Sequence, residues 1–353
     1  MYGPSKDATW PRVDSMPAGS YVNLKAFIGV IVIFLSCCLS VGLFPLIITV
    51  VAIMDLVRAS RWSGCRAVVY LTGFLCVNLL GLLGAFCTGL LLPFVSHERW
   101  VRMGYGLQHW WARRMSDMLM WVYGMRLSVE GLEGLENTPF ILLCKHTSMA
   151  DTVLPLWVFS VHRGTFLRYV LKEELLADPL FNIVGRRFPN IFVKRGSGDA
   201  QAQSDRVGVL SRDLNPGDGV VIYPEGTRFT TAKRDRVKAK LQDSASENLR
   251  NHAAKVVNVL PLRSAGAVAL LENGGDTPVL ICGHVGFEGA RTLRHLWGGD
   301  LIGSQIKVKI WKHESHTIPT DPEAREKWLY DQWEIMDQWV SEVRAPKTTK
   351  EEI

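Results

Sequence analysis

Two long stretches without a charged side chain dominate the first hundred residues. Residues 26–54 carry no charge, and residues 67–96 carry none either. Each stretch exceeds the roughly 20 residues that a helix needs to cross a bilayer. A cleaved signal peptide fits poorly, because the first stretch is too long and a second one follows it. The sequence therefore predicts a two-helix membrane anchor over residues 25–96, preceded by a polar tail at residues 1–24.

The arrangement of these two helices stays open at this point. Pro45 lies in the second half of the first stretch, where it would kink or break a helix. The pair can cross the bilayer with a short turn between them, or bend into one leaflet, and both arrangements leave the chain ends on one side. Two core helices of a soluble protein are the third alternative. Charge does not decide the orientation, because arginines flank the second stretch on both sides: Arg58, Arg61 and Arg66 before it, and Arg99, Arg102, Arg113 and Arg114 after it.

The next segment, residues 97–124, is basic and rich in tryptophan. Tryptophan and arginine together at the end of a membrane helix are typical of an interfacial amphipathic segment. An ordinary amphipathic helix packed on the following domain explains the pattern equally well. The tryptophans are Trp100, Trp110, Trp111 and Trp121.

From Met125 onward the pattern alternates between strands and helices. Such alternation predicts an α/β fold, with a mostly parallel sheet flanked by helices, over residues 125–345. A short charged tail follows at residues 346–353. The expected strands are 127–130, 140–144, 168–171, 190–193, 220–223, 279–283 and 306–311. The expected helices are 152–161, 180–186, 200–212, 231–254, 265–273 and 322–343.

Charge and cysteine usage narrow the class of protein. The net charge of +6 suits an anionic membrane surface or phosphorylated ligands. We expect no nucleic-acid partner, because the chain has no arginine-rich tail and no recognisable nucleic-acid module. The seven cysteines are odd in number and have no CxxC spacing, so they predict neither a disulfide framework nor a zinc site.

The apolar run at residues 140–144 leads almost directly into His146, and Asp151 follows five residues later. The run reads as a buried strand and a helical pattern follows it, so both residues lie at a strand-to-helix junction. Asp151 can reach His146 only if the histidine sits in the loop and the aspartate in the first helical turn. It could then fix the tautomer of an imidazole that takes a proton from a hydroxyl. The alternative is a helix capping box running from Ser148 to Asp151, which needs no chemistry.

Two further strand ends carry polar residues. Lys194 and Arg195, followed by two glycines, could hold a phosphate through charge and backbone N–H groups, although a solvated strand end fits too. At residues 225–228 the chain reads Glu-Gly-Thr-Arg directly after an apolar strand. Arg228 could grip a phosphate with its planar fork, or it could pair with Glu225 to brace the turn at Gly226.

In this order the motifs resemble the four blocks of the glycerolipid acyltransferase family, which includes the 1-acyl-glycerol-3-phosphate acyltransferases. His146 and Asp151 match its H-x4-D block, and Glu225 to Arg228 match its E-G-T-R block. Phe192, Val193 and Arg195 match the second block, and Pro261 matches the proline of the fourth. The resemblance covers roughly residues 120–345. Residues 225–230, 318–321 and 328–330 resemble the branch that holds lysocardiolipin acyltransferases and longer lysophosphatidic acid acyltransferases. Lys145, where many members have Asn, and Pro189, where many have Gly, depart from the pattern.

The resemblance implies an acyltransferase that is an integral membrane protein with its catalytic domain on the cytoplasmic face. The acyl group would move from acyl-CoA, or from acyl carrier protein, to the free hydroxyl of lysophosphatidic acid and give phosphatidic acid. The alternative acceptor is a larger lysophospholipid such as lysocardiolipin or lysophosphatidylinositol. Acyl-CoA would be a co-substrate, with no cofactor and no metal.

The resemblance also assigns roles within the site. His146 would act as the general base, oriented by Asp151, with no acyl-enzyme, because no serine or cysteine lies in a recognisable nucleophile elbow. The acceptor phosphate and glycerol would be bound by Lys194, Arg195, Glu225, Gly226, Thr227 and Arg228, with Glu225 positioning Arg228 or the glycerol. Two rival classes are a metal hydrolase built on His146, Asp151 and His162, and a catalytically silent membrane scaffold of the same fold.

Overall fold

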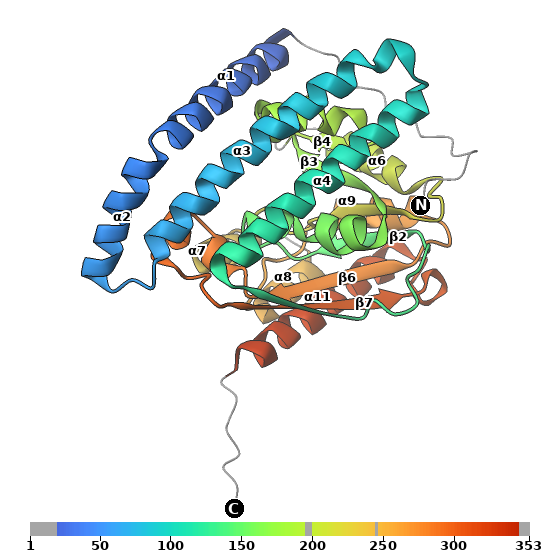
Figure 1. Cartoon of the computed structure of the whole chain (residues 1–353). Coiled ribbons are helices and arrows are strands. Elements are labelled where there is room, and N and C mark those ends of the chain that lie inside the picture. Colours follow the sequence, from blue (N-terminus) through green and yellow to red (C-terminus); the bar gives the residue numbers. More distant parts are fainter. Residues whose placement is uncertain (1–19, 195–199, 244–245, 346–353) are drawn as a thin grey trace, which may run out of the picture.

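The computed structural model describes residues 20–194, 200–243 and 246–345 (Figure 1). Its centre is a seven-stranded sheet in the order β1-β7-β6-β2-β5-β3-β4. All seven strands expected from the sequence are present, and the predicted mostly parallel α/β fold is confirmed. The strands are β1 Arg126–Glu130, β2 Phe140–Cys144, β3 Phe166–Lys172, β4 Ile191–Val193, β5 Asp218–Ile222, β6 Val279–Val285 and β7 Gln305–His313.

Strand direction gathers the predicted motifs at one edge of the sheet. The neighbouring strands β6, β2, β5, β3 and β4 all run parallel, whereas β7 runs antiparallel to β6. The carboxyl ends of the five parallel strands therefore lie along one edge. The H-x4-D motif follows β2, the Glu-Gly-Thr-Arg motif follows β5, and Lys194 follows β4. In open α/β sheets this edge is where ligands bind.

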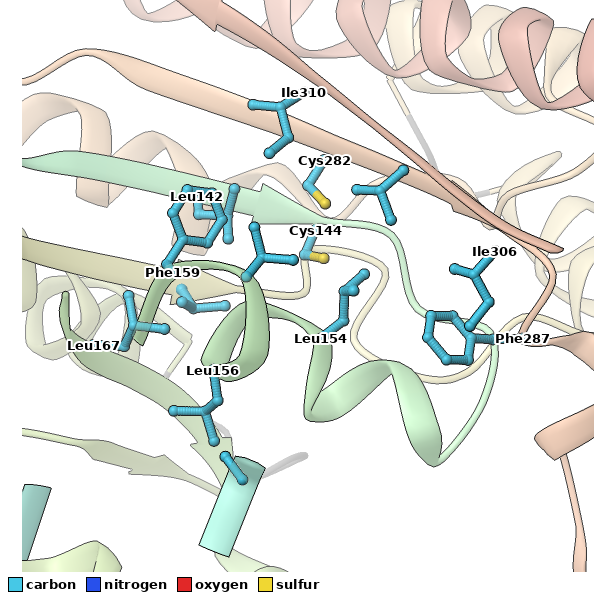
Figure 2. Packing of buried hydrophobic residues seen from close by; sticks show 14 of the residues in the cluster. Leu142, Cys144, Leu154, Leu156, Phe159, Leu167, Cys282, Phe287, Ile306 and Ile310 are labelled. Atoms are coloured by element: carbon cyan, nitrogen blue, oxygen red, sulfur yellow. The ribbon is translucent and has the colours of Figure 1, made fainter. Parts of the chain in front are cut away.

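Both faces of the sheet are covered, and β2 shows why its sequence is a continuous apolar run. All five residues of β2 are buried. Leu142 and Cys144 point into one core cluster, shown in Figure 2 with Phe159 and Cys282, whereas Ile141 points into the second cluster on the opposite face. Alternate residues of a strand face opposite sides, so a central strand with two covered faces needs apolar residues throughout.

The N-terminal apolar stretches form a bent helix and a straight one. The first divides into α1 (Ser20–Gly42) and α2 (Phe44–Arg58), and Pro45 lies in the first turn of α2, so the predicted break is present. The second forms α3 (Ser63–Leu90). Two helical spans, Leu24–Gly42 and Ser63–Phe94, are long and apolar enough to cross a membrane.

These helices lie along the domain rather than apart from it (Figure 1). Near the start of α3, Arg66 donates to the carbonyl oxygen of Val122. Near its end, Arg187 donates to Thr88 Oγ1 at 2.6 Å and to the carbonyl oxygen of Ala85 at 2.7 Å. α3 is therefore tied to α4 near its start and to the domain near its end.

Residues 97–123 form one amphipathic helix, α4 (His97–Tyr123). Its apolar face is buried, with Tyr105, Ala112 and Tyr123 each no more than 1% exposed. The helix packs on α3 and on the helical segment that follows the H-x4-D motif. Packing on the domain thus accounts for this face, and a role at a membrane interface stays a prediction for the opposite face, where Trp121 is 79% exposed.

The helices of the domain depart from expectation in three places. The single helix expected at 152–161 is a 3₁₀ turn, η2 (Ala150–Thr152), followed by a π-helix, η3 (Leu156–Val161). The helix expected at 231–254 is two helices, because Ser246 caps a new one by accepting from Leu249 N. A further helix, α10 (Leu293–Gly298), was not expected. The remaining bounds are α5 Pro179–Ile183, α6 Ala200–Gly208, α7 Thr231–Leu241, α8 Glu247–Lys255, α9 Ser264–Asn273 and α11 Pro322–Arg344.

Candidate active site

His146 and Asp151 form a hydrogen-bonded dyad at the carboxyl end of β2. His146 lies in the loop after the strand and Asp151 in the first turn of η2, as the sequence predicts. His146 Nδ1 is 2.8 Å from Asp151 Oδ1. The Asp151 side chain is fully buried, whereas that of His146 is 12% exposed. Since Asp151 occupies Nδ1, the imidazole presents Nε2 to a substrate, which is the geometry a general base requires.

The second oxygen of Asp151 holds the loop backbone. Oδ2 accepts hydrogen bonds from Thr147 N, from Ser148 N at 2.8 Å and from Thr147 Oγ1 at 3.1 Å. Asp151 N in turn donates to Ser148 Oγ at 3.1 Å, which completes a capping box. The capping box and the dyad therefore coexist, because each uses a different carboxylate oxygen. Burial alone would raise the pKa of Asp151, but the hydrogen bond and charge of His146 outweigh it and lower the pKa.

Glu225 is buried and ties two loops together through their backbones. Its Oε1 accepts from His146 N and its Oε2 from Leu260 N, each at 3.0 Å. Glu225 therefore holds the loop of the dyad against the Leu-Pro-Leu-Arg stretch that begins at Leu260. Burial raises the pKa of Glu225 to about 8, against the pull of these two N–H groups and of Lys145.

Replacing Glu225 with glutamine is expected to remove one source of pH-dependent stability. The folded-state pKa lies near 8 and the ordinary value is 4.5, so the folded protein binds this proton more readily between those values. The stability contributed by Glu225 is present below pH 4.5 and is lost as the pH rises through 8. The difference in melting temperature between the wild type and E225Q should thus decrease as the pH is raised from about 5 to 9. A constant difference would contradict the raised pKa.

The rest of the Glu-Gly-Thr-Arg motif forms a tight turn. Gly226 has a positive φ of 68°, a conformation that favours glycine. Lys233 Nζ donates to Thr227 Oγ1 at 3.2 Å, and Arg228 Nη1 donates to the carbonyl oxygen of Arg291 at 3.3 Å. Within the described residues, Arg228 is therefore held by the loop before α10 and Glu225 by two backbone N–H groups.

The second motif lies at the same edge of the sheet but farther along it. Lys194 is exposed directly after β4, and β4 is separated from β5 by β3 alone. Strands are about 4.8 Å apart, so Lys194 follows a strand roughly 10 Å from β5. Arg195, the other predicted phosphate ligand, lies outside the described residues.

Two buried residues next to the dyad, Lys145 and His284, were not predicted to belong to the site. Lys145 Nζ donates to the carbonyl oxygen of His284 at 3.1 Å, and His284 Nε2 lies 3.4 Å from Asp151 Oδ2. His284 comes directly after the expected strand 279–283, and this position at a strand end is the sequence signal that could have found it. The sequence could not show that this strand lies beside β2.

A metal site would need several ligands in one place. Among residues 20–194, 200–243 and 246–345, no group of three or more His, Cys, Asp or Glu side chains could hold a metal ion. His162, which a metal hydrolase would have needed beside the dyad, lies just beyond η3, with its ring 5.5 Å from that of Trp157.

Comparison with known proteins shows what this part of the chain is similar to. The Acyltransferase family model matches residues 126–263. These residues are therefore similar to an acyltransferase domain. The matched segment contains every residue that the sequence analysis placed in the site, from His146 to Arg228, whereas His284 and the apolar helices lie outside it.

Several relatives are similar to parts of this chain. A 1-acyl-sn-glycerol-3-phosphate acyltransferase of Pseudomonas aeruginosa is 32% identical over 145 residues, 39% of this chain and 49% of the relative. One of Cocos nucifera is 30% identical over 119 residues, 33% of this chain and 36% of the relative. A lyso-ornithine lipid O-acyltransferase of Rhizobium meliloti is 25% identical over 186 residues, 53% and 60% of the two chains. The chain thus spans from about a third to three fifths of the length of these relatives.

A solved structure shares the fold. The crystal structure of the 1-acyl-sn-glycerophosphate acyltransferase PlsC from Thermotoga maritima superimposes with a TM-score of 0.50 at 15% sequence identity. The match covers 80% of this chain and 99% of PlsC. Since the match covers more of this chain than residues 126–263 alone, the likeness in fold extends beyond the segment matched by the family model.

Proposed function

We propose that this protein is a membrane-bound acyltransferase that moves a fatty acyl group from acyl-CoA to the free hydroxyl of lysophosphatidic acid, giving phosphatidic acid. The observation that carries the proposal is the His146–Asp151 dyad, with Nδ1 and Oδ1 2.8 Å apart, inside an acyltransferase domain. The 1-acyl-sn-glycerol-3-phosphate acyltransferases among the relatives support this acceptor. A larger lysophospholipid is the alternative, and the lyso-ornithine lipid O-acyltransferases indicate that acceptors differ among the relatives.

In the proposed reaction Asp151 keeps the Nδ1 proton of His146 in place, which leaves Nε2 free to act as the base. Nε2 takes the proton of the acceptor hydroxyl. At the same time the hydroxyl oxygen attacks the carbonyl carbon of the thioester and forms a new C–O bond. The tetrahedral intermediate collapses with cleavage of the C–S bond. The imidazolium returns its proton to the leaving CoA sulfur, so His146 ends the cycle neutral and no acyl-enzyme forms.

A product assay tests the proposal. Purified full-length protein would be incubated with each of several lysophospholipids, paired with acyl-CoA or acyl carrier protein donors, and products identified by mass spectrometry. We expect phosphatidic acid from lysophosphatidic acid and acyl-CoA. Faster turnover of lysocardiolipin or lysophosphatidylinositol would show that a larger lysophospholipid is the acceptor. If no product forms with any pair of acceptor and donor, the proposed activity is refuted.

The arrangement of the apolar helices supports a membrane-bound enzyme whose helices bend into one leaflet. The outward side chains of α1 are apolar and well exposed: Phe27 by 62%, Phe34 by 50% and Leu39 by 63%. Such a surface needs a lipid or protein cover. Because α3 is held by α4 at Arg66 and by the domain at Thr88, it has little free length with which to cross a bilayer.

Sedimentation with lipid vesicles checks the membrane contact. We expect the full-length chain to stay with anionic vesicles after an alkaline carbonate wash. Replacing Phe27 and Phe34 with serine should release a substantial part of it, because each exposed aromatic ring contributes apolar area to the contact. Ile335→Ser on α11 is the matched control, since Ile335 is also exposed, by 47%. Equal retention of both variants would count against contact through α1.

Arg228→Lys tests the proposed grip on the acceptor phosphate. Among the described residues, Arg228 donates only to the carbonyl oxygen of Arg291, and a guanidinium has five N–H donors with which to bind a phosphate. Lysine keeps the charge but loses the bidentate fork, which should lower kcat/KM for the acceptor roughly five- to 150-fold. The kcat/KM for acyl-CoA should change less.

A nearby arginine serves as the control for this substitution. Arg234 on α7 donates to the carbonyl oxygen of Val257, so Arg234→Lys should leave acceptor kinetics unchanged. If Arg228 only stabilises the loop before α10, the melting temperature of Arg228→Lys will fall, and kcat/KM for both substrates will fall by similar factors. That result would remove Arg228 from the phosphate site.

A further inference from the structure

His284 lies beside the dyad on the neighbouring strand. β6 runs parallel to β2, with Cys282 opposite Cys144, so His284 comes level with the loop that carries the dyad. Its side chain is fully buried. Nε2 lies 3.0 Å from the carbonyl oxygen of Lys145 and 3.4 Å from Asp151 Oδ2. Both of these oxygens are acceptors, so Nε2 carries the proton and points it at them.

His284 approaches Asp151 as a neutral group. Burial lowers the pKa of His284 to about 4, in spite of the opposing pull of Asp151. Its Nδ1 is buried and has no hydrogen-bond partner among the described residues. A neutral ring offers Asp151 the dipole of one N–H without cancelling the carboxylate charge. That charge is what stabilises the His146 imidazolium during the reaction.

His284 and Lys145 hold each other through their backbones. Lys145 Nζ donates to the carbonyl oxygen of His284, and His284 Nε2 donates to that of Lys145. The charge of the buried lysine acts on Glu288. Burial would raise the pKa of Glu288, but Lys145 and Arg344 outweigh it and hold the pKa near 2. The two hydrogen bonds therefore tie the end of β6 to the residue that precedes His146.

We propose that His284 is a positioning residue of the His146–Asp151 dyad, which acts by holding Oδ2 of Asp151 and the Lys145 carbonyl so that Oδ1 stays aimed at His146. The inference rests on the proposed function. Among the described residues, the hydrogen bonds and the ion pair of His284 lead to Lys145 and Asp151 and none leads to His146, so it acts through Asp151 and the loop. The Acyltransferase family match ends at residue 263, before β6, so this support comes from outside the matched segment.

His284→Leu should lower kcat on the order of tenfold and leave KM for both substrates unchanged, because the residue positions the dyad and binds neither substrate. His284→Gln, whose amide can reach a similar place as Nε2–H, should restore activity to within about threefold. His313→Leu on β7 is the matched control. His313 pairs with Val279 at the opposite end of β6, so its loss should leave kcat unchanged.

The pH profile gives a readout that general destabilisation would not move. Without the N–H of His284, more of the Asp151 charge acts on His146, so the acidic limb of kcat/KM should shift to higher pH. His313→Leu should leave the limb in place. The other titratable and charged groups around Asp151 and His284 are unchanged between these variants: His146, Lys145, Cys144, Tyr223, Glu225, Glu288 and Arg344.

A double-variant cycle with Asp151→Asn isolates the path. If His284 acts through Asp151, His284→Leu should lower kcat by a much smaller factor in the Asp151→Asn variant than in the wild type. Equal losses in both backgrounds, or a folded His284→Leu with wild-type kcat and pH profile, would overturn the inference. His284→Asn, which is too short to reach Asp151, gives the same comparison if leucine prevents folding. A wild type inactive on every acceptor would instead overturn the proposed function, and this inference with it.

Discussion

Replacing His146 with alanine is expected to abolish acyl transfer while leaving the protein folded. The imidazole is the group that takes the proton of the acceptor hydroxyl, and loss of a general base typically costs roughly 10²- to 10⁴-fold in rate. The loop should survive, because its hydrogen bonds to Glu225 and Phe229 use the backbone N–H and carbonyl of residue 146. The measurement is kcat with saturating lysophosphatidic acid and acyl-CoA, beside a melting curve in the same detergent.

His162→Ala is the control that separates this mechanism from its rival. His162 is exposed and its ring lies 5.5 Å from that of Trp157 rather than in the dyad, so a general-base mechanism built on His146 does not need it. A metal hydrolase using both histidines would lose activity in either variant. More than about a tenth of wild-type activity in His146→Ala would rule out His146 as the base.

The parts of the fold that the sequence predicted are those set by local pattern. β2 could be predicted because its five apolar residues are bounded by Pro139 and Lys145, and both of its faces are buried. The dyad was readable because His146 and Asp151 are joined by a short loop whose geometry leaves one workable arrangement. Strand direction then explained why motifs distant in sequence share one edge.

The parts that escaped prediction depend on contacts between distant segments. Glu225 bonds to the backbone of His146 and Leu260, which lie 79 and 35 residues away in the chain, and a backbone N–H leaves no trace in sequence. The role of His284 depends on β6 lying next to β2, which only the strand order supplies. The helix expected at 231–254 divides at Ser246, which caps the second helix. Because Ser246 lies in a polar stretch, the sequence alone did not mark it as a cap.

Asp151→Asn is expected to be nearly as damaging as loss of His146, for a reason that lies in the hydrogen bonds of the loop. Thr147 N, Ser148 N and Thr147 Oγ1 all donate to Oδ2 of Asp151, so an asparagine will turn its carbonyl oxygen toward them. Its NH2 group must then face His146 Nδ1. Nδ1 can only accept from an NH2 group, so the proton moves to Nε2.

An imidazole in that tautomer has no free Nε2 with which to take a proton from the acceptor. The buried negative charge that stabilises the imidazolium is also gone. The same change in a serine protease leaves the geometry intact and lowers kcat about 10⁴-fold, and we expect a loss on the order of 10³- to 10⁴-fold here. Because the capping bonds survive, the melting temperature should change little. Asp178→Asn, at the half-buried cap of α5, is the control for losing a capping carboxylate away from the dyad. Wild-type kcat in Asp151→Asn would leave the capping box as the whole role of Asp151.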